Sequence, residues 1–304
     1  MKRAASFILT FTAALAANPL SAQNYPQQPP PYYGQQQSYP QQAPAYGTQQ
    51  LDDLVGRIAL YPDPLLAQVL TASTYSYQIL DAAGWARAHA YLAPDQMVRA
   101  IREDGLPWDP SVIGLIPFPS VLNMLAGDMN WTQQLESAVL ASRSAVMDAV
   151  QAQRSLALGY GYLRSNSQIR VVANPGYIEI LPVEPGVIYA PYYDPYVVFR
   201  RPRPGLVVGG AISFGPRISI GVFAPWGWGG AAFGWREHAI IVNSRPWERN
   251  WENREAYRHQ YEAVRPRAEA PRVERHELRE YRGEERRRDD RREDRRDERR
   301  DERR

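Results

Sequence analysis

Three Asp-Pro dipeptides supply the carboxylates that are best placed to do chemistry. Two carboxyl groups at a fixed separation suffice for general acid and base catalysis on a glycosidic bond, so these acids are catalytic candidates for a cell-wall glycan hydrolase. An Asp before Pro also suits a helix start, because its carboxylate accepts from free N–H groups while Pro takes the next position. We prefer this capping interpretation for the first two, but residues 196–199 look extended and make it less suitable for the third. The candidates are Asp63, Asp109 and Asp194, with Asp148 and Glu179 as further acids.

Aromatic residues near these acids are candidates for ligand binding. Tyr75 directly precedes Ser76, a possible helix cap, and Trp108 directly precedes Asp109. Tyr192 and Tyr193 lie directly before Asp194. Such rings can stack on a sugar, although large aromatic residues most often fill a hydrophobic core. Both interpretations remain open for these four residues.

Several other chemistries are excluded by residue usage. The chain of 304 residues has no Cys, and its single lysine, Lys2, lies in a predicted signal peptide, so thiolate and Schiff-base catalysis are absent. The four histidines form no two-His metal spacing. We therefore expect no metal site and no cofactor. These histidines are His89, His238, His259 and His276.

The stretch 57–77 is the element around which we expect the rest to be organised. Pro62 ends a first helix, and Asp63 with Pro64 starts a second one. An apolar stripe at helical spacing follows. Its members are Leu65, Leu66, Val69 and Leu70.

This stretch also carries a resemblance. The run 59–70, ALYPDPLLAQVL, resembles the signature of a bacterial family catalogued as domain of unknown function 3300. The resemblance covers about residues 51–243. It implies an exported or membrane-associated envelope protein with no established activity, so it supplies no catalytic residues. Further matching motifs are ASTY at 72–75, WDPSV at 108–112, FP at 118–119 with VL at 121–122, MDAVQ at 147–151, YAP at 189–191 and YDP at 193–195.

Residues 1–22 read as a secretory signal peptide. Lys2 and Arg3 precede an apolar run over 7–17, and small residues follow before Gln23. We expect cleavage between Ala22 and Gln23 and export to the periplasm or cell envelope. Residues 23–50 are rich in Gln, Pro, Tyr and Gly, which predicts a disordered linker.

The remaining pattern predicts an α+β fold. Residues 51–160 read as a helical domain with repeated Pro-based starts, and its longest helix is expected to begin at a cap on Asn130 and to continue past 150. Residues 161–204 read as a small antiparallel β meander. Its type II turns are Asn174-Pro175-Gly176 and Glu184-Pro185-Gly186, and its expected strands are 168–173, 177–182 and 187–192.

The Gly-rich apolar segment 205–243 allows three interpretations. Residues 218–235 contain no charge, which meets the length of a transmembrane helix, but five Gly, one Pro and the nearby Arg217 favour β structure or an irregular flap. A third interpretation is insertion into a membrane surface. The side chains that would insert are Trp226, Trp228, Phe233 and Trp235.

Residues 244–304 alternate Arg with Asp and Glu, which predicts a disordered polyampholyte tail. Each Arg pair has acids beside it that would repel phosphates, so we expect no nucleic-acid partner. We predict an exported envelope protein that binds or scaffolds wall or envelope components. The alternatives are a protein anchored in or on the membrane through 205–235 and a carboxylate-dependent glycan hydrolase; the oligomeric state stays open.

Overall fold

Proline marks the start of five helices in the computed structural model, which describes residues 42–202 and 210–258. A missing N–H costs nothing in the first turn of a helix, where each of these prolines lies: Pro64, Pro94, Pro110, Pro119 and Pro195. The helices are α1 (Thr48–Val55), α2 (Asp63–Ser73), α3 (Ser76–Ala88), α4 (Pro94–Glu103), α5 (Pro110–Gly114), α6 (Pro119–Gly127), α7 (Met129–Ala141), α8 (Arg143–Gly159) and α9 (Pro195–Val198).

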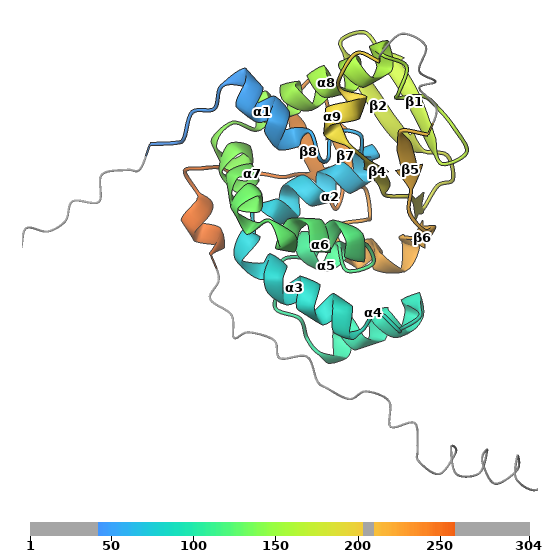
Figure 1. Ribbon diagram of the computed structural model, residues 1–304. Coiled ribbons are helices and arrows are strands. Elements are labelled where there is room, and N and C mark those ends of the chain that lie inside the picture. Colours follow the sequence, from blue (N-terminus) through green and yellow to red (C-terminus); the bar gives the residue numbers. More distant parts are fainter. Residues whose placement is uncertain (1–41, 203–209, 259–304) are drawn as a thin grey trace, which may run out of the picture. The chain divides into compact units, whose positions relative to one another are not determined.

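Helix α2 lies in the middle of the body, as the stretch 57–77 predicted (Figure 1). All its residues except Pro64 are buried, and its neighbours include α3, α5, α7, β2, β7 and β8. A helix that is apolar on every side is stable only when it is enclosed. The packing of the other elements against α2 therefore defines the core.

The long helix that the sequence predicts is two helices. Asp128, and not Asn130, caps α7 by accepting from the N–H of Trp131 at 3.1 Å. Ser142 separates α7 from α8, and its hydroxyl accepts from the N–H of Ala145 at 3.4 Å. The apolar pattern does not reveal such a break, because buried residues recur at helical spacing in both helices.

The α+β fold class is confirmed, with one difference in strand pairing. Strands β1 and β2 form the expected hairpin, and Gly176 has the positive φ of 93° that its turn requires. The third expected strand, 187–192, is divided into β3 and β4, which pair with β6 and β5 instead of β2. The strands are β1 (Ile169–Asn174), β2 (Tyr177–Pro182), β3 (Val187–Ile188), β4 (Pro191–Tyr193), β5 (Ile212–Phe214), β6 (Ile218–Ser219), β7 (Ala232–Gly234), β8 (Ala239–Val242) and β9 (Arg245–Pro246).

The described part of the segment 205–243 is folded into the body as short strands and the 3₁₀ helix η1 (Gly221–Trp226). Trp228 and Trp235 are each only 6% exposed, and Trp226 and Phe233 are half-buried against the same core, so all four rings pack on the body. Within residues 42–202 and 210–258, no helix has both the length and the apolar character needed to cross a bilayer. Residues 205–209 lie outside the described residues.

The first residues of the expected tail are also folded. Residues 244–258, here called the strap, include β9 and the 3₁₀ helix η2 (Arg254–Tyr257). Arg249 of the strap is 1% exposed and donates to the carbonyl of Thr74 at 2.6 Å. At the other end of the body α1 begins at Thr48, within the expected linker. The signal peptide, the linker up to residue 41 and the tail from 259 lie outside the described residues.

Candidate functional site

Asp63 is a structural residue in the core. It is 4% exposed, and its carboxylate pairs with the guanidinium of Arg154 at 2.7 Å. The indole N–H of Trp235 and the backbone N–H of Ile180 donate to the same carboxylate at 2.9 and 3.2 Å. A buried charge is stable when it is paired and hydrogen-bonded in this way. Asp63 therefore neither caps α2 with its side chain nor faces a substrate.

Arg154 completes this buried network. Its side chain is fully buried and donates to the carbonyls of Ala59, Tyr61 and Ile178 at 2.9, 2.9 and 2.7 Å. Its guanidinium also lies 4.9 Å from the centre of the Trp235 ring. One side chain thus joins α8 to the turn before α2 and to β2.

Asp109 caps α5, as its Pro-linked position predicts. Its carboxylate accepts from the backbone N–H of Ser111 at 2.9 Å and from the hydroxyl of the same residue. It lines an open cavity of about 710 Å³ together with Tyr75 and the strap residue Tyr257. Burial is the main cause that raises the pKa of Tyr75, and the nearby carboxylate of Asp109 raises it further. The phenol therefore stays protonated at neutral pH.

Arg245 lines this cavity, and the guanidinium of the buried Arg249 lies 4.3 Å from the centre of the Tyr75 ring. Trp108, another binding candidate, is 4% exposed and so belongs to the core.

The two further candidate acids each have a side-chain partner. Asp148 contacts the ring of His238 at 2.9 Å, and Glu179 accepts from Asn174 at 2.8 Å. None of these contacts forms a paired catalytic arrangement with Asp109.

Asp194 caps the short helix α9 and accepts from the N–H of Tyr196 at 2.8 Å. The expectation that residues 196–199 are extended is therefore wrong. One helical turn after Asp-Pro is too short to give a periodic signal, so only the cap itself could have indicated it.

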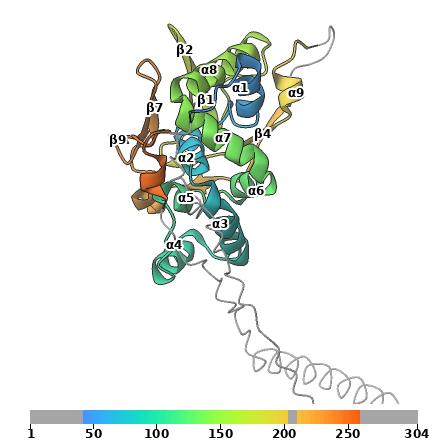
Figure 2. The same ribbon diagram turned by 90° about the vertical axis from the view of Figure 1, so that its left-hand side faces the viewer.

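Asp194 lines a cavity of about 790 Å³, which we call the tyrosine groove. Figure 2 shows α1, α9 and β4, which contribute to it, on the same side of the body. Tyr192 and Tyr196 present rings that are 43% and 74% exposed. The groove is lined by Gln49, Asp52, Asp53, Gly56, Arg57, Tyr61, Met124, Trp131, Gln153, Leu156, Pro191, Tyr192, Tyr193, Asp194, Pro195, Tyr196, Phe199 and Arg200.

Two of the tyrosines that line the groove have buried hydroxyl groups. Burial raises the pKa of both Tyr61 and Tyr193 above the usual range, so they remain neutral. The oxygen of Tyr193 accepts from the backbone N–H of Leu60 at 3.2 Å, and its ring meets Phe199 edge to face. Tyr193 therefore fixes the wall on which the exposed ring of Tyr192 is presented.

The charges in the groove are partly matched. Arg57 pairs with Asp128 at 3.0 Å, and its guanidinium also covers the ring of Trp131. The N–H of Trp131 and then Arg57 hold the pKa of Asp128 below its usual value. Asp52, Asp53 and Arg200 were missed by sequence reasoning, because nothing in the sequence places α1 beside α9.

The sequence candidates are thus distributed over three places. Asp63 lies in the core, Asp109 beside Tyr75, and Asp194 beside Tyr192 and Tyr193 in the tyrosine groove. A retaining or inverting glycosidase needs two carboxyl groups facing one substrate. The three candidate acids do not meet this requirement together.

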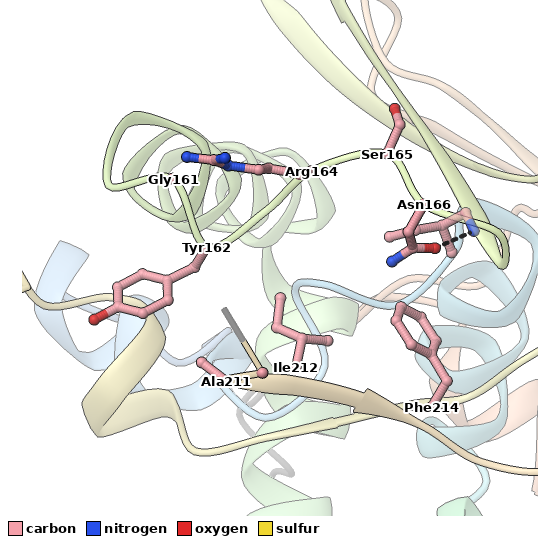
Figure 3. Close-up of a pocket in the computed structure, with 10 residues that line it drawn as sticks. Gly161, Tyr162, Arg164, Ser165, Asn166, Ala211, Ile212 and Phe214 are labelled. Carbon is pink, nitrogen blue, oxygen red and sulfur yellow. Dashed lines mark hydrogen bonds between the residues drawn. The ribbon is translucent and has the colours of Figure 1, made fainter. Parts of the chain in front are cut away.

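A smaller cavity of about 480 Å³ lies between the loop after α8 and β5 (Figure 3). The side chain of Asn166 is engaged in the turn, where it accepts from the N–H groups of Gln168 and Ile169 at 2.8 and 2.9 Å. Gly210, the first residue after the undescribed segment 203–209, also lines this cavity. We assign it no function.

Comparison with known proteins agrees with the motifs. A family model described as "Protein of unknown function (DUF3300)" matches residues 47–266. The chain belongs to this family. It is also 34% identical over 184 residues to "Uncharacterized protein YacH" of Escherichia coli (strain K12), a match that covers 50% of this chain and 30% of that protein. No solved structure matches the chain.

The DUF3300 match ends at residue 266, beyond the strap, whereas sequence reasoning ended the body at 243. The folded strap explains the first part of this extension. The family's motif residues have structural roles here: Asp63 anchors the core pair, while Asp109 and Asp194 cap helices. Among residues 42–202 and 210–258, no three His, Asp or Glu side chains are grouped to hold a metal ion.

Proposed function

We propose that this DUF3300 protein is exported and binds a glycan of the cell envelope through the tyrosine groove. The observation that carries the proposal is the pair of exposed rings, Tyr192 and Tyr196, at the edge of a cavity that also contains carboxylates and amides. Aromatic rings exposed beside polar groups suit a ligand with flat apolar faces and many hydroxyls, as a sugar chain has.

The polar part of the groove supports the same ligand class. Asp52, Asp53 and Gln49 come from α1, and Gln153 comes from α8. Carboxylates accept and amides both donate and accept, so these groups match hydroxyls that do both. Helices α1 and α8 pack against each other although they are far apart in the sequence, so the fold holds these polar groups in place.

The proposal of export is supported by the charge and apolar pattern of residues 1–22, with cleavage between Ala22 and Gln23. A mature chain in the periplasm or envelope would meet wall glycan directly. Binding without catalysis is the function we favour, because Asp63, Asp109 and Asp194 lie in separate places, so a hydrolase would have to use Asp194 with Asp52 or Asp53 of the groove. Scaffolding would follow if the linker and tail attach to further envelope components.

The test is binding of the mature chain, beginning at Gln23, to isolated wall sacculi and to soluble wall oligosaccharides. We expect saturable binding, and we expect the double substitution Tyr192→Ala with Tyr196→Ala to weaken it roughly tenfold or more, as for paired aromatic contacts in other interfaces. Both rings are exposed, so the fold should survive their removal.

The matched control is Tyr91→Ala, which removes a ring that is 59% exposed and does not line the groove. Binding should be unchanged in this variant. Absence of binding to every wall fraction, or equal losses in the control and the double variant, would show that the tyrosine groove is not a glycan site.

A further inference from the structure

A second cavity has a different chemical character from the tyrosine groove. It has a volume of about 250 Å³ and lies between the end of α3, the start of α4, the α5–α6 junction and β6 with η1. Helix α4 and strand β6 both lie at the lower right of the body in Figure 1. Its rim carries four prolines, so we call it the proline-rimmed pocket; they are Pro94, Pro117, Pro119 and Pro216.

The interior of the proline-rimmed pocket is apolar. Met97, Ile116 and Phe223 line it and are 8%, 1% and 1% exposed. The prolines of the rim have no N–H to offer a ligand. An apolar cavity of 150 Å³ is already large enough to hold benzene, so this larger one has room for a short alkyl chain.

A single charged side chain, Arg217, lines this pocket in addition to the apolar residues. Its guanidinium pairs with the carboxylate of Glu184, and both side chains are 53% exposed. Exposed pairs of this kind are weak, so another anion can take the place of Glu184. The pocket therefore combines an apolar interior with an exchangeable cation at its edge.

We propose that the proline-rimmed pocket binds the alkyl chain of a small anionic amphiphile, such as a medium-chain fatty acid, and that Arg217 holds its head group. The alkyl chain removes apolar surface of Met97, Ile116 and Phe223 from water. The carboxylate of the ligand replaces Glu184 as the partner of Arg217. This site is separate from the tyrosine groove and does not depend on glycan binding.

The test is calorimetric titration of the mature chain with decanoate below its micelle concentration, with decanol as the uncharged comparison. We expect saturable binding that is tighter for decanoate. Glu184→Gln should strengthen decanoate binding roughly three- to tenfold, because it removes the competing carboxylate. Arg217→Gln should weaken decanoate binding by a similar factor and leave decanol binding unchanged.

Two further variants test whether the chain enters this pocket. Ala90→Trp places a large ring at an exposed lining position and should abolish the binding of both ligands. Leu80→Ala, which removes a 55% exposed apolar side chain elsewhere on α3, should not change it. The proposal is overturned if decanoate shows no saturable binding, if Ala90→Trp has no effect, or if Glu184 and Arg217 substitutions leave the preference for decanoate over decanol intact.

Discussion

Asp63 and Arg154 depend on each other, because neither side chain reaches water. Asp63→Asn leaves the guanidinium buried without a counter-charge, and we expect it to lower the free energy of unfolding by about 3–5 kcal/mol. Urea denaturation measures this loss. Replacing both residues, with Asp63→Asn and Arg154→Met, should cost less than the sum of the two single changes.

The exposed pair between Arg217 and Glu184 is the control for this prediction. Glu184→Gln should change the free energy of unfolding by less than about 1 kcal/mol, because water already screens the pair. Equal losses at Asp63 and Glu184 would contradict the structural role that we assign to the buried pair.

Glu136 offers a prediction of pH dependence. Burial is the main cause that raises the pKa of Glu136, and it outweighs the hydrogen bond from Ser76 and the attraction of Arg249, which lower it. The folded state therefore binds a proton more tightly than the unfolded state does. The stability contributed by Glu136 is present below the unfolded pKa and is lost as the pH rises through the folded pKa.

Glu136→Gln keeps an acceptor for Ser76 but removes the buried charge. We therefore expect this variant to have a higher Tm than the natural protein at pH 7, and we expect the difference to vanish below pH 4 or so, where Glu136 is protonated in both states. Thermal unfolding at a series of pH values follows the difference. A lower Tm at pH 7 would contradict the direction of the pKa shift.

At the residue scale, sequence reasoning succeeded where a role is local. Asp109 could be predicted as a cap because its partner, Ser111, is two residues away. Asp63 has the same Asp-Pro context, but its partners come from α8 and the strand region. No pattern in the sequence connects Asp63 to Arg154, so its role as a buried anchor could not be predicted.

At the element scale, a comparison of two glycines distinguishes the free-energy cost of a strained backbone from the cost of a steric clash. Gly176 and Gly227 both have φ of +93°, a region that other residues rarely adopt. A Cβ at Gly176 would meet no atom within 4 Å, whereas one at Gly227 would lie 2.2 Å from the amide nitrogen of the buried Gln68. The two positions thus differ only in their surroundings.

We expect Gly176→Ala to destabilise the protein by about 1–2 kcal/mol through backbone strain alone. Gly227→Ala should cost about 1–3 kcal/mol more, because the buried amide of Gln68 must shift and give up its hydrogen bond to the carbonyl of Trp226. Chemical denaturation of the two variants tests the difference. Similar losses would show that Gln68 yields easily.

The strap provides another prediction for an element. Arg249 donates to the carbonyls of Thr74 and Arg254, and the N–H of Trp251 donates to the carbonyl of Leu140. Ending the chain after Asn243 removes these bonds, so we expect a Tm lower by several degrees. Ending it after Arg258 keeps them and should leave the Tm unchanged. Differential scanning calorimetry compares the two truncated proteins.

Strand pairing shows why elements are only partly predictable. The β1–β2 hairpin follows from its own two-residue turn, so sequence could place it. The pairing of β3 with β6 and of β4 with β5 depends on residues that follow much later in the chain. The residues Glu184-Pro185-Gly186 predicted a turn correctly, but they do not determine which strand pairs with β3.

At the scale of the whole molecule, the fold class was predictable because helices with Pro-based starts and a β hairpin are local features. The tyrosine groove was not, since it forms where α1, α8 and α9 meet. Tyr192, Tyr193 and Asp194 were singled out on chemical type alone. Their grouping with Asp52 and Asp53 required the fold.

The burial of Trp228 and Trp235 leads to a prediction about the behaviour of the whole protein in cells. Both rings pack in the core, and Trp235 also donates to Asp63, so exposing them to lipid would disrupt the buried pair. We therefore expect carbonate and high-salt washes to release the untagged protein from a membrane pellet into the soluble envelope fraction. Immunoblotting of the fractions measures this. Retention through both washes would mean that residues 205–235 leave the core in the cell, and it would favour the anchored alternative over a soluble glycan-binding protein.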